Sequence, residues 1–78
     1  MKVSVIFPDK TVGVNGVFYV IPSITPTDPN YSVIQWYDDN HGTIEVYMGD
    51  RIWFTDESIV QPYIDAWNQA NSASATSS

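Results

Sequence analysis

Two hydrophobic periodicities divide this chain into a strand region and a helix region. As far as Phe54, apolar and polar residues alternate in short runs separated by turn residues, which is typical of antiparallel strands. From Thr55 to Ala70 the apolar residues recur every three or four positions, which is typical of an amphipathic helix. The pattern predicts three strands, a loop, three further strands and one C-terminal helix.

Turn residues locate the strands within the first region. Asn15-Gly16 between two apolar runs is a strong signal of a β-hairpin, because both residues tolerate a positive φ. Residues 22–31 contain three prolines and no periodic pattern, so we interpret them as a loop that either connects two hairpins or binds a partner. Residues 38–42 are expected to form a five-residue turn. The expected strands are Val3–Phe7, Thr11–Val14, Val17–Ile21, Ser32–Tyr37, Thr43–Tyr47 and Arg51–Phe54.

The helix is expected from about Ser58 to Gln69. Thr55 or Ser58 can cap its N-terminus, and Pro62 suits the first turn, where a missing N–H removes no helical hydrogen bond. Residues 71–78 are rich in serine and alanine without a large apolar side chain, which predicts a disordered tail.

Alternation within each strand separates a core face from a second face. The core face is aliphatic or bulky in every strand, and apolar residues of the helix should cover it. The expected core residues are Val3, Val5, Phe7, Val12, Val14, Ile34, Trp36, Ile44, Val46, Ile52 and Phe54, covered by Ile59, Tyr63, Ile64 and Trp67. In the third strand, either Val17, Tyr19 and Ile21 or Phe18 and Val20 face the core.

The element order predicts an α+β fold, in which a curled antiparallel sheet of five to six short strands packs one face against a single C-terminal helix. The opposite face is expected to carry Tyr37, Tyr47, Trp53 and Phe18. Short turns make three of the strands involved neighbours, so we expect Tyr37, Tyr47 and Trp53 to cluster. Two interpretations stay open, which are cross-strand pairing within a sheet that curls toward a barrel, and a partner-binding surface for another protein.

Size and charge narrow the class of protein. Seventy-eight residues allow one domain, which we place at residues 1–70. Nine acidic and three basic residues give a net charge of −6, which argues against nucleic-acid binding because phosphates require a basic surface. No apolar run is long enough to span a membrane, and the absence of cysteine excludes disulfides and thiolate chemistry.

No group of residues predicts an enzyme, a metal site or a cofactor. His41 is the single histidine, and its neighbours Asp38 and Asp39 are typical of a solvated turn. The acidic run from Asp38 to Glu45 lacks the register of a calcium-binding EF-hand loop.

Five segments carry a further pattern. They are Val5–Asp9, Val14–Val17, Ile34–Asp39 (Ile-Gln-Trp-Tyr-Asp-Asp), Gly42–Glu45 (Gly-Thr-Ile-Glu) and Pro62–Trp67 (Pro-Tyr-Ile-Asp-Ala-Trp). Taken together they resemble a group of short proteins encoded among the virion and tail-fibre genes of tailed bacteriophages.

The resemblance implies a non-enzymatic structural or assembly accessory protein of a phage, which binds another virion protein in the tail region or a second copy of itself. Its place would be the virion or the host cytoplasm. The alternative is a phage-encoded inhibitor that binds a host protein, since a strongly acidic chain suits a decoy for a nucleic-acid-binding target.

Overall fold

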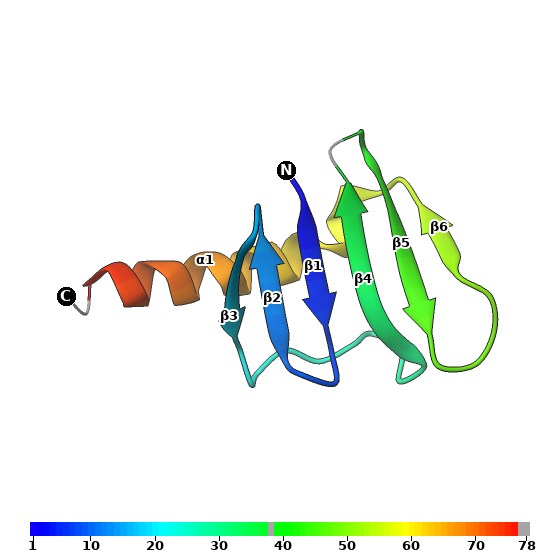
Figure 1. The fold of residues 1–78 in the computed structure, drawn as a ribbon, viewed down its shortest axis with the longest axis horizontal. Helices are drawn as coiled ribbons and strands as arrows, with labels where there is room; N and C mark the ends of the chain where they lie inside the picture. Colours follow the sequence, from blue (N-terminus) through cyan, green and yellow to red (C-terminus); the bar gives the residue numbers. More distant parts are fainter. Residues whose placement is uncertain (38, 77–78) are drawn as a thin grey trace.

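A computed structural model describes the backbone of residues 1–37 and 39–76, and the side chains as far as residue 73. Six antiparallel strands form one open sheet in the order β3-β2-β1-β4-β5-β6, and a single long helix lies on one face (Figure 1). The predicted α+β architecture is therefore confirmed. The elements are β1 (Val3–Ile6), β2 (Thr11–Val14), β3 (Val17–Val20), β4 (Tyr31–Tyr37), β5 (His41–Val46), β6 (Ile52–Phe54), the 3-10 turn η1 (Glu57–Ile59) and α1 (Gln61–Thr76).

Two three-stranded meanders meet in the middle of the sheet, where β1 pairs with β4. In the first meander, Asn15 and Gly16 have φ angles of 52° and 87°, so the predicted hairpin turn is confirmed. The Asn15 side-chain oxygen also accepts a hydrogen bond of 3.1 Å from the backbone N–H of Lys2, which fixes the start of β1 beside this turn.

The turn between β4 and β5 is shorter than predicted, because β5 already begins at His41 and pairs it with Tyr37. Asp38 lies outside the described residues. The next turn is held by Asn30, whose side chain accepts from the Met48 N–H at 3.0 Å and donates to the Met48 carbonyl at 2.7 Å.

The proline-containing segment between β3 and β4 packs on the helix side of the sheet. Ile24 is buried in the core, and its carbonyl oxygen accepts a hydrogen bond of 3.0 Å from Lys10 Nζ. The Tyr63 hydroxyl of α1 donates to the Thr25 carbonyl at 3.0 Å. The segment is therefore tied to α1 and leaves the opposite face of the sheet open.

The helix differs from the prediction at both ends. Asp56, rather than Thr55 or Ser58, caps the initial turn, and its carboxylate accepts the Ser58 N–H at 3.0 Å. Hydrogen bonds from Ser58 lower the pKa of this carboxyl. At the other end, α1 continues to Thr76, so the segment from Asn71 to Thr76 is helical where a disordered tail was predicted. Residues 77–78 lie outside the described residues.

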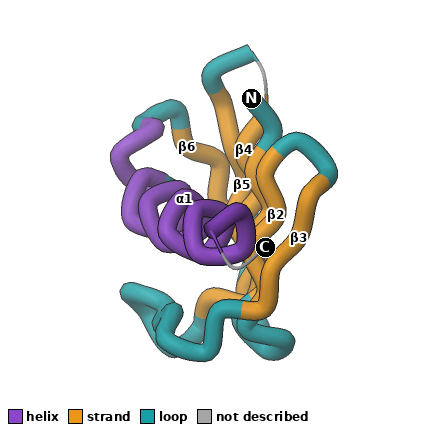
Figure 2. The backbone as a smooth tube through the Cα atoms, turned by 90° about the vertical axis from the view of Figure 1, so that its left-hand side faces the viewer, coloured by secondary structure: helices purple, strands orange, loops and turns teal. Residues whose placement is uncertain are grey.

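The helix is off-centre on the sheet. It packs mainly against β2 and β3, on one face, and its C-terminal turns extend beyond β3 (Figures 1 and 2). Tyr63 and Ile64 are its buried residues, and Val60, just before its first turn, is buried as well although it is absent from the predicted core. Trp67, predicted to face the core, is half-buried above β3 and donates its indole N–H to the Val17 carbonyl at 2.8 Å.

The opposite end of the sheet is consequently less covered. Ile52, predicted as a core residue, is 40% exposed, because α1 packs far from β6. Val46 and Phe54 are half-buried for the same reason, whereas the other predicted core-face residues of the strands are buried. In β3, Tyr19 faces the helix and Ile21 after it is buried, which settles the assignment that the sequence left open.

Two aromatic rings cover glycines in neighbouring strands. Phe18 lies over Gly13 on the face away from α1, and Phe54 lies over Gly42 on the helix face, where its ring stacks on Trp36 at 5.5 Å. A Cβ atom at either glycine would overlap with the ring, so only glycine leaves room for it. The ring in turn supplies the side-chain contact that the glycine lacks.

We predict that Gly42→Ala destabilises the protein by about 2–3 kcal/mol, more than Gly13→Ala, which should cost less than about 1 kcal/mol. The new methyl at position 42 would meet the Gln35 carbonyl as well as the Phe54 ring, whereas the half-exposed Phe18 ring can rotate away from position 13. Chemical denaturation of both variants checks the order. Equal losses would show that both rings are equally fixed.

Stability should also fall at alkaline pH because of Tyr63. Burial, with a smaller contribution from Tyr31, raises the pKa of its hydroxyl above the ordinary value of about 10. The folded state thus favours the neutral form, and its contribution is complete below about pH 10 and lost as the pH rises through the folded-state pKa. Urea unfolding between pH 8 and pH 11.5 (about the range in which tyrosines ionise) should show a steeper decline for the wild type than for Tyr63→Phe.

Candidate interaction surface

The outer face, meaning the sheet face opposite α1, is polar in the middle and aromatic at both edges. Strand register aligns one residue from every strand in a single row across this face. At the centre of this row, the Ser4 hydroxyl donates a hydrogen bond of 2.7 Å to the Gln35 side-chain carbonyl. The row runs Phe18, Gly13, Ser4, Gln35, Thr43, Trp53.

Tyr37, His41 and Trp53 form an aromatic stack at the end of the outer face near β6. The His41 ring lies 4.8 Å from the Tyr37 ring at 30°, and 5.7 Å from the Trp53 ring at 27°. Asp39 pairs with His41 through Nδ1, on the turn that leads into β5. Trp53 is 66% exposed and belongs to the edge strand, so its ring is both supported by the stack and open to solvent.

His41 is the residue that the sequence prediction missed. The sequence drew attention to it only as a candidate base, whereas in the structure it joins two of the predicted binding residues. The strand register could have identified it, because a three-residue turn after Tyr37 pairs His41 with Tyr37 in the neighbouring strand.

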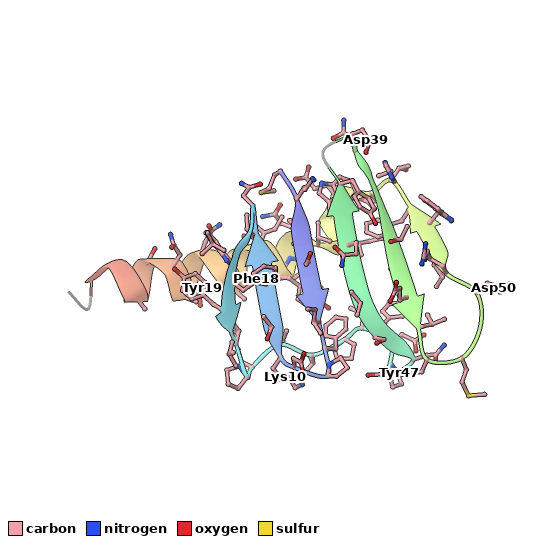
Figure 3. The ribbon with its side chains drawn as sticks, in the orientation of Figure 1. Lys10, Phe18, Tyr19, Asp39, Tyr47 and Asp50 are labelled. Carbon is pink, nitrogen blue, oxygen red and sulfur yellow. The ribbon has the colours of Figure 1, made fainter. Side chains whose placement is uncertain are left out.

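Tyr47 lies away from the aromatic stack, so the prediction that it clusters with Tyr37 and Trp53 is wrong. Figure 3 places Tyr47 at the end of the sheet opposite to Asp39. Its N–H donates to the Asn30 carbonyl at 2.9 Å, and its side chain is 60% exposed. Alternation along β5 places Tyr47 on the predicted face, but several residues from Trp53 along the strand direction.

Phe18 lies on the opposite edge of the sheet, in β3, together with the exposed Val20. The four predicted binding residues therefore occupy three separate places on the outer face. Tyr37 and Trp53 alone share one site, through His41.

Within residues 1–37 and 39–73, no three histidine, aspartate or glutamate side chains come together in a way that could hold a metal ion. Among the described elements, no helix has the length and apolar character needed to cross a membrane. A cavity of about 320 Å³ lies between the loop residues 23–27 and α1, lined by three hydroxyl side chains and by Pro62, Tyr63 and Ala66.

Comparisons of this chain with protein-family models, with curated proteins and with solved structures found no match. The function is therefore argued from the surface itself.

We predict that His41→Ala separates the two outer rings of the stack while the protein stays folded. The loss should be about 0.5–1.5 kcal/mol, since this histidine is half-buried and its ring contacts are those of a surface stack. Near-ultraviolet circular dichroism should lose the tryptophan signal that depends on the stack, and the Tyr47→Ala variant should retain it. An unchanged spectrum in His41→Ala would show that Trp53 is oriented by other contacts.

Proposed function

We propose that this protein is a non-enzymatic binding module, a structural or assembly accessory protein of a bacteriophage that binds another virion protein in the tail region. The observation that carries the proposal is the exposed Trp53 ring held in a fixed orientation by His41 and Tyr37. Tryptophan and tyrosine dominate the residues that contribute most to protein–protein binding.

The stack favours binding because it fixes Trp53 before a partner arrives. An exposed tryptophan on a flexible segment loses rotational freedom when it binds, whereas the Trp53 ring, stacked on His41, has already lost part of it. The partly exposed Gln35, in the same row as Trp53, supplies hydrogen-bonding groups of the kind found around an aromatic centre in interfaces.

The phage assignment rests on the resemblance described for Ile34–Asp39 and the other four segments. It places the protein in the virion or, during assembly, in the host cytoplasm. Inhibition of a host protein is the second candidate, and the net charge of −6 favours it because an acidic surface attracts basic, nucleic-acid-binding targets.

Capture from infected cells tests the proposal. The tagged wild-type protein should retain a virion protein, identified by mass spectrometry, and Tyr37→Thr with Trp53→Thr should reduce that capture at least about tenfold, as expected when binding hot spots are removed. Tyr47→Thr is the matched control, because Tyr47 is equally aromatic and exposed but lies at the other end of the sheet.

The outcome separates the candidates. Capture of a host nucleic-acid-binding protein, together with absence of the chain from purified particles, would support inhibition in place of assembly. Loss of capture in Tyr47→Thr with retention in the double variant would move the binding surface to the Asn30–Met48 end of the sheet.

A further inference from the structure

The two edges of the sheet differ in how the helix covers them. Tyr19 of β3 contacts the Trp67 ring at 5.6 Å, and its hydroxyl donates to the Asn71 side chain at 2.9 Å, so α1 crosses β3 at this level. The helix then continues from Ser72 to Thr76, a segment we call the overhang (Figure 1). Five residues of helix advance about 7.5 Å, which exceeds the spacing of about 4.8 Å between neighbouring strands. The overhang therefore extends over the place where one further strand would lie beside β3.

At the other edge, the same face lacks its cover. Ile52 of β6 points to the helix side of the sheet, as its pairing with the buried Ile44 shows, and is 40% exposed. At the β3 edge, the helix thus extends beyond the last strand of the sheet. At the β6 edge, the last strand extends beyond the helix.

Both edges also present free backbone groups in matching positions. The N–H of Ile21 donates to the Lys10 carbonyl, so the alternation of an antiparallel ladder turns the N–H and C=O groups of Phe18 and Val20 outward. The N–H of Tyr47 donates to the Asn30 carbonyl, and the same alternation through β5 turns those of Trp53 outward. All three residues carry their side chains on the outer face.

We propose that this protein associates head to tail with a second copy of itself, by pairing of β3 in one copy with β6 in the next. The inference goes beyond the proposed binding function, because it adds a second copy of the chain as a partner and names the edges that pair. β3 and β6 run in opposite directions within the alternating sheet, so a copy moved along the sheet continues the antiparallel order. The overhang of the first copy then covers the β6 edge of the second.

The pairing accounts for the exposed apolar side chains of both edges. With Trp53 of the second copy opposite Phe18, the two aromatic rings become a cross-strand pair on the outer face. Ile52 of the second copy then lies opposite Tyr19, beneath the overhang. Val20, which is 70% exposed, comes to lie beside Arg51 of the second copy. β3 has no charged residue, proline or bulge, which are the features that usually protect an edge strand from pairing.

A symmetric pairing of two β3 strands is disfavoured by the same overhang. The two-fold axis that pairs Phe18 with Val20 of the other copy would pass midway between the two copies of Tyr19, at the level where α1 crosses β3. Both overhangs would then meet end to end within one strand spacing. The asymmetric pairing avoids this collision, because the overhang meets an edge that α1 leaves uncovered.

The association should be weak and should strengthen with salt. A pairing through three-residue β6 buries less surface than a stable interface, and two copies with a charge of −6 each repel one another. Sedimentation velocity from about 0.01 to 1 mM protein, the range suited to small interfaces, should show a sedimentation coefficient that rises with concentration and with sodium chloride.

Single substitutions on β3 test the edge. Val20→Lys places a like charge beside Arg51 of the second copy and should weaken association about three- to tenfold, although it lowers the overall repulsion between copies. Val20→Glu, the matched control, should retain association because it pairs with Arg51. Circular dichroism and denaturation confirm that both variants fold, as expected at a side chain this exposed. Equal effects of the two substitutions, or none, would overturn the pairing.

A mixture of two blocked variants tests its direction. Ile52→Lys weakens the β6 edge, and Val20→Lys weakens the β3 edge, so each variant alone should stay largely monomeric at a protein concentration at which the wild type associates. Mixed together they should form a one-to-one dimer and nothing larger, because each retains the edge that the other lacks. Dimerisation of Ile52→Lys alone would show the symmetric β3 contact and overturn the head-to-tail arrangement, as would a mixture that stays monomeric.

Truncation after Asn71 tests the overhang directly. The shortened chain keeps Trp67 and the buried residues of α1, so it should fold, and it should associate about tenfold more weakly than the full chain. Association of undiminished strength would remove the overhang from the proposal. This measurement uses purified protein alone, so its failure leaves capture of a virion protein by the aromatic stack as a separate question.

Discussion

The position of α1 on the sheet is the constraint on which the other features depend. Tyr63 ties the start of the helix to the Thr25 carbonyl, and Trp67 ties its middle to the Val17 carbonyl. Between these two hydrogen bonds, Ile64 fills the core. Because one helix of this length is fixed over β2 and β3, it leaves the β6 edge open and extends past β3. The core, the half-buried residues of the last strands and the unequal edges all follow from this displacement.

The aromatic residues on the two faces of the sheet show two physical roles. Phe18 and Phe54 fill the space above glycines, which is a packing role within the chain. Tyr37 and Trp53 are joined through a histidine and remain partly open to solvent. Cross-strand aromatic pairing, one of the two interpretations left open by the sequence, is therefore present on the outer face, where it supports the exposed Trp53 ring.

The fold was largely predictable, because strand alternation and helical spacing are local and strong signals. The hairpin at Asn15-Gly16 is an example, since its backbone conformation depends on two residues alone. Whether Tyr47 clusters with Trp53 could not be predicted from local signals. Alternation predicts which face a residue occupies, but its distance from a residue in the next strand depends on the strand register, which the structure supplies. Ile52 was assigned to the core for a similar reason, as no local pattern states how far a helix extends over a sheet. The helical turns beyond Asn71 consist of serine, alanine and threonine. These residues give no apolar periodicity from which a helix could be predicted.

The pairing between β3 and α1 also bears on how the chain is made. The hydrogen bond from Trp67 to Val17 joins residues 50 positions apart, and α1 follows all six described strands along the chain. The first meander, complete after Val20, has its apolar inner side uncovered until α1 becomes available. Long-range contacts of this kind slow folding, and exposed strands are prone to aggregate meanwhile. The native structure of this region therefore forms only after α1 has been synthesised, and until then the edge of β3 and the apolar inner side of the meander are open to non-native pairing.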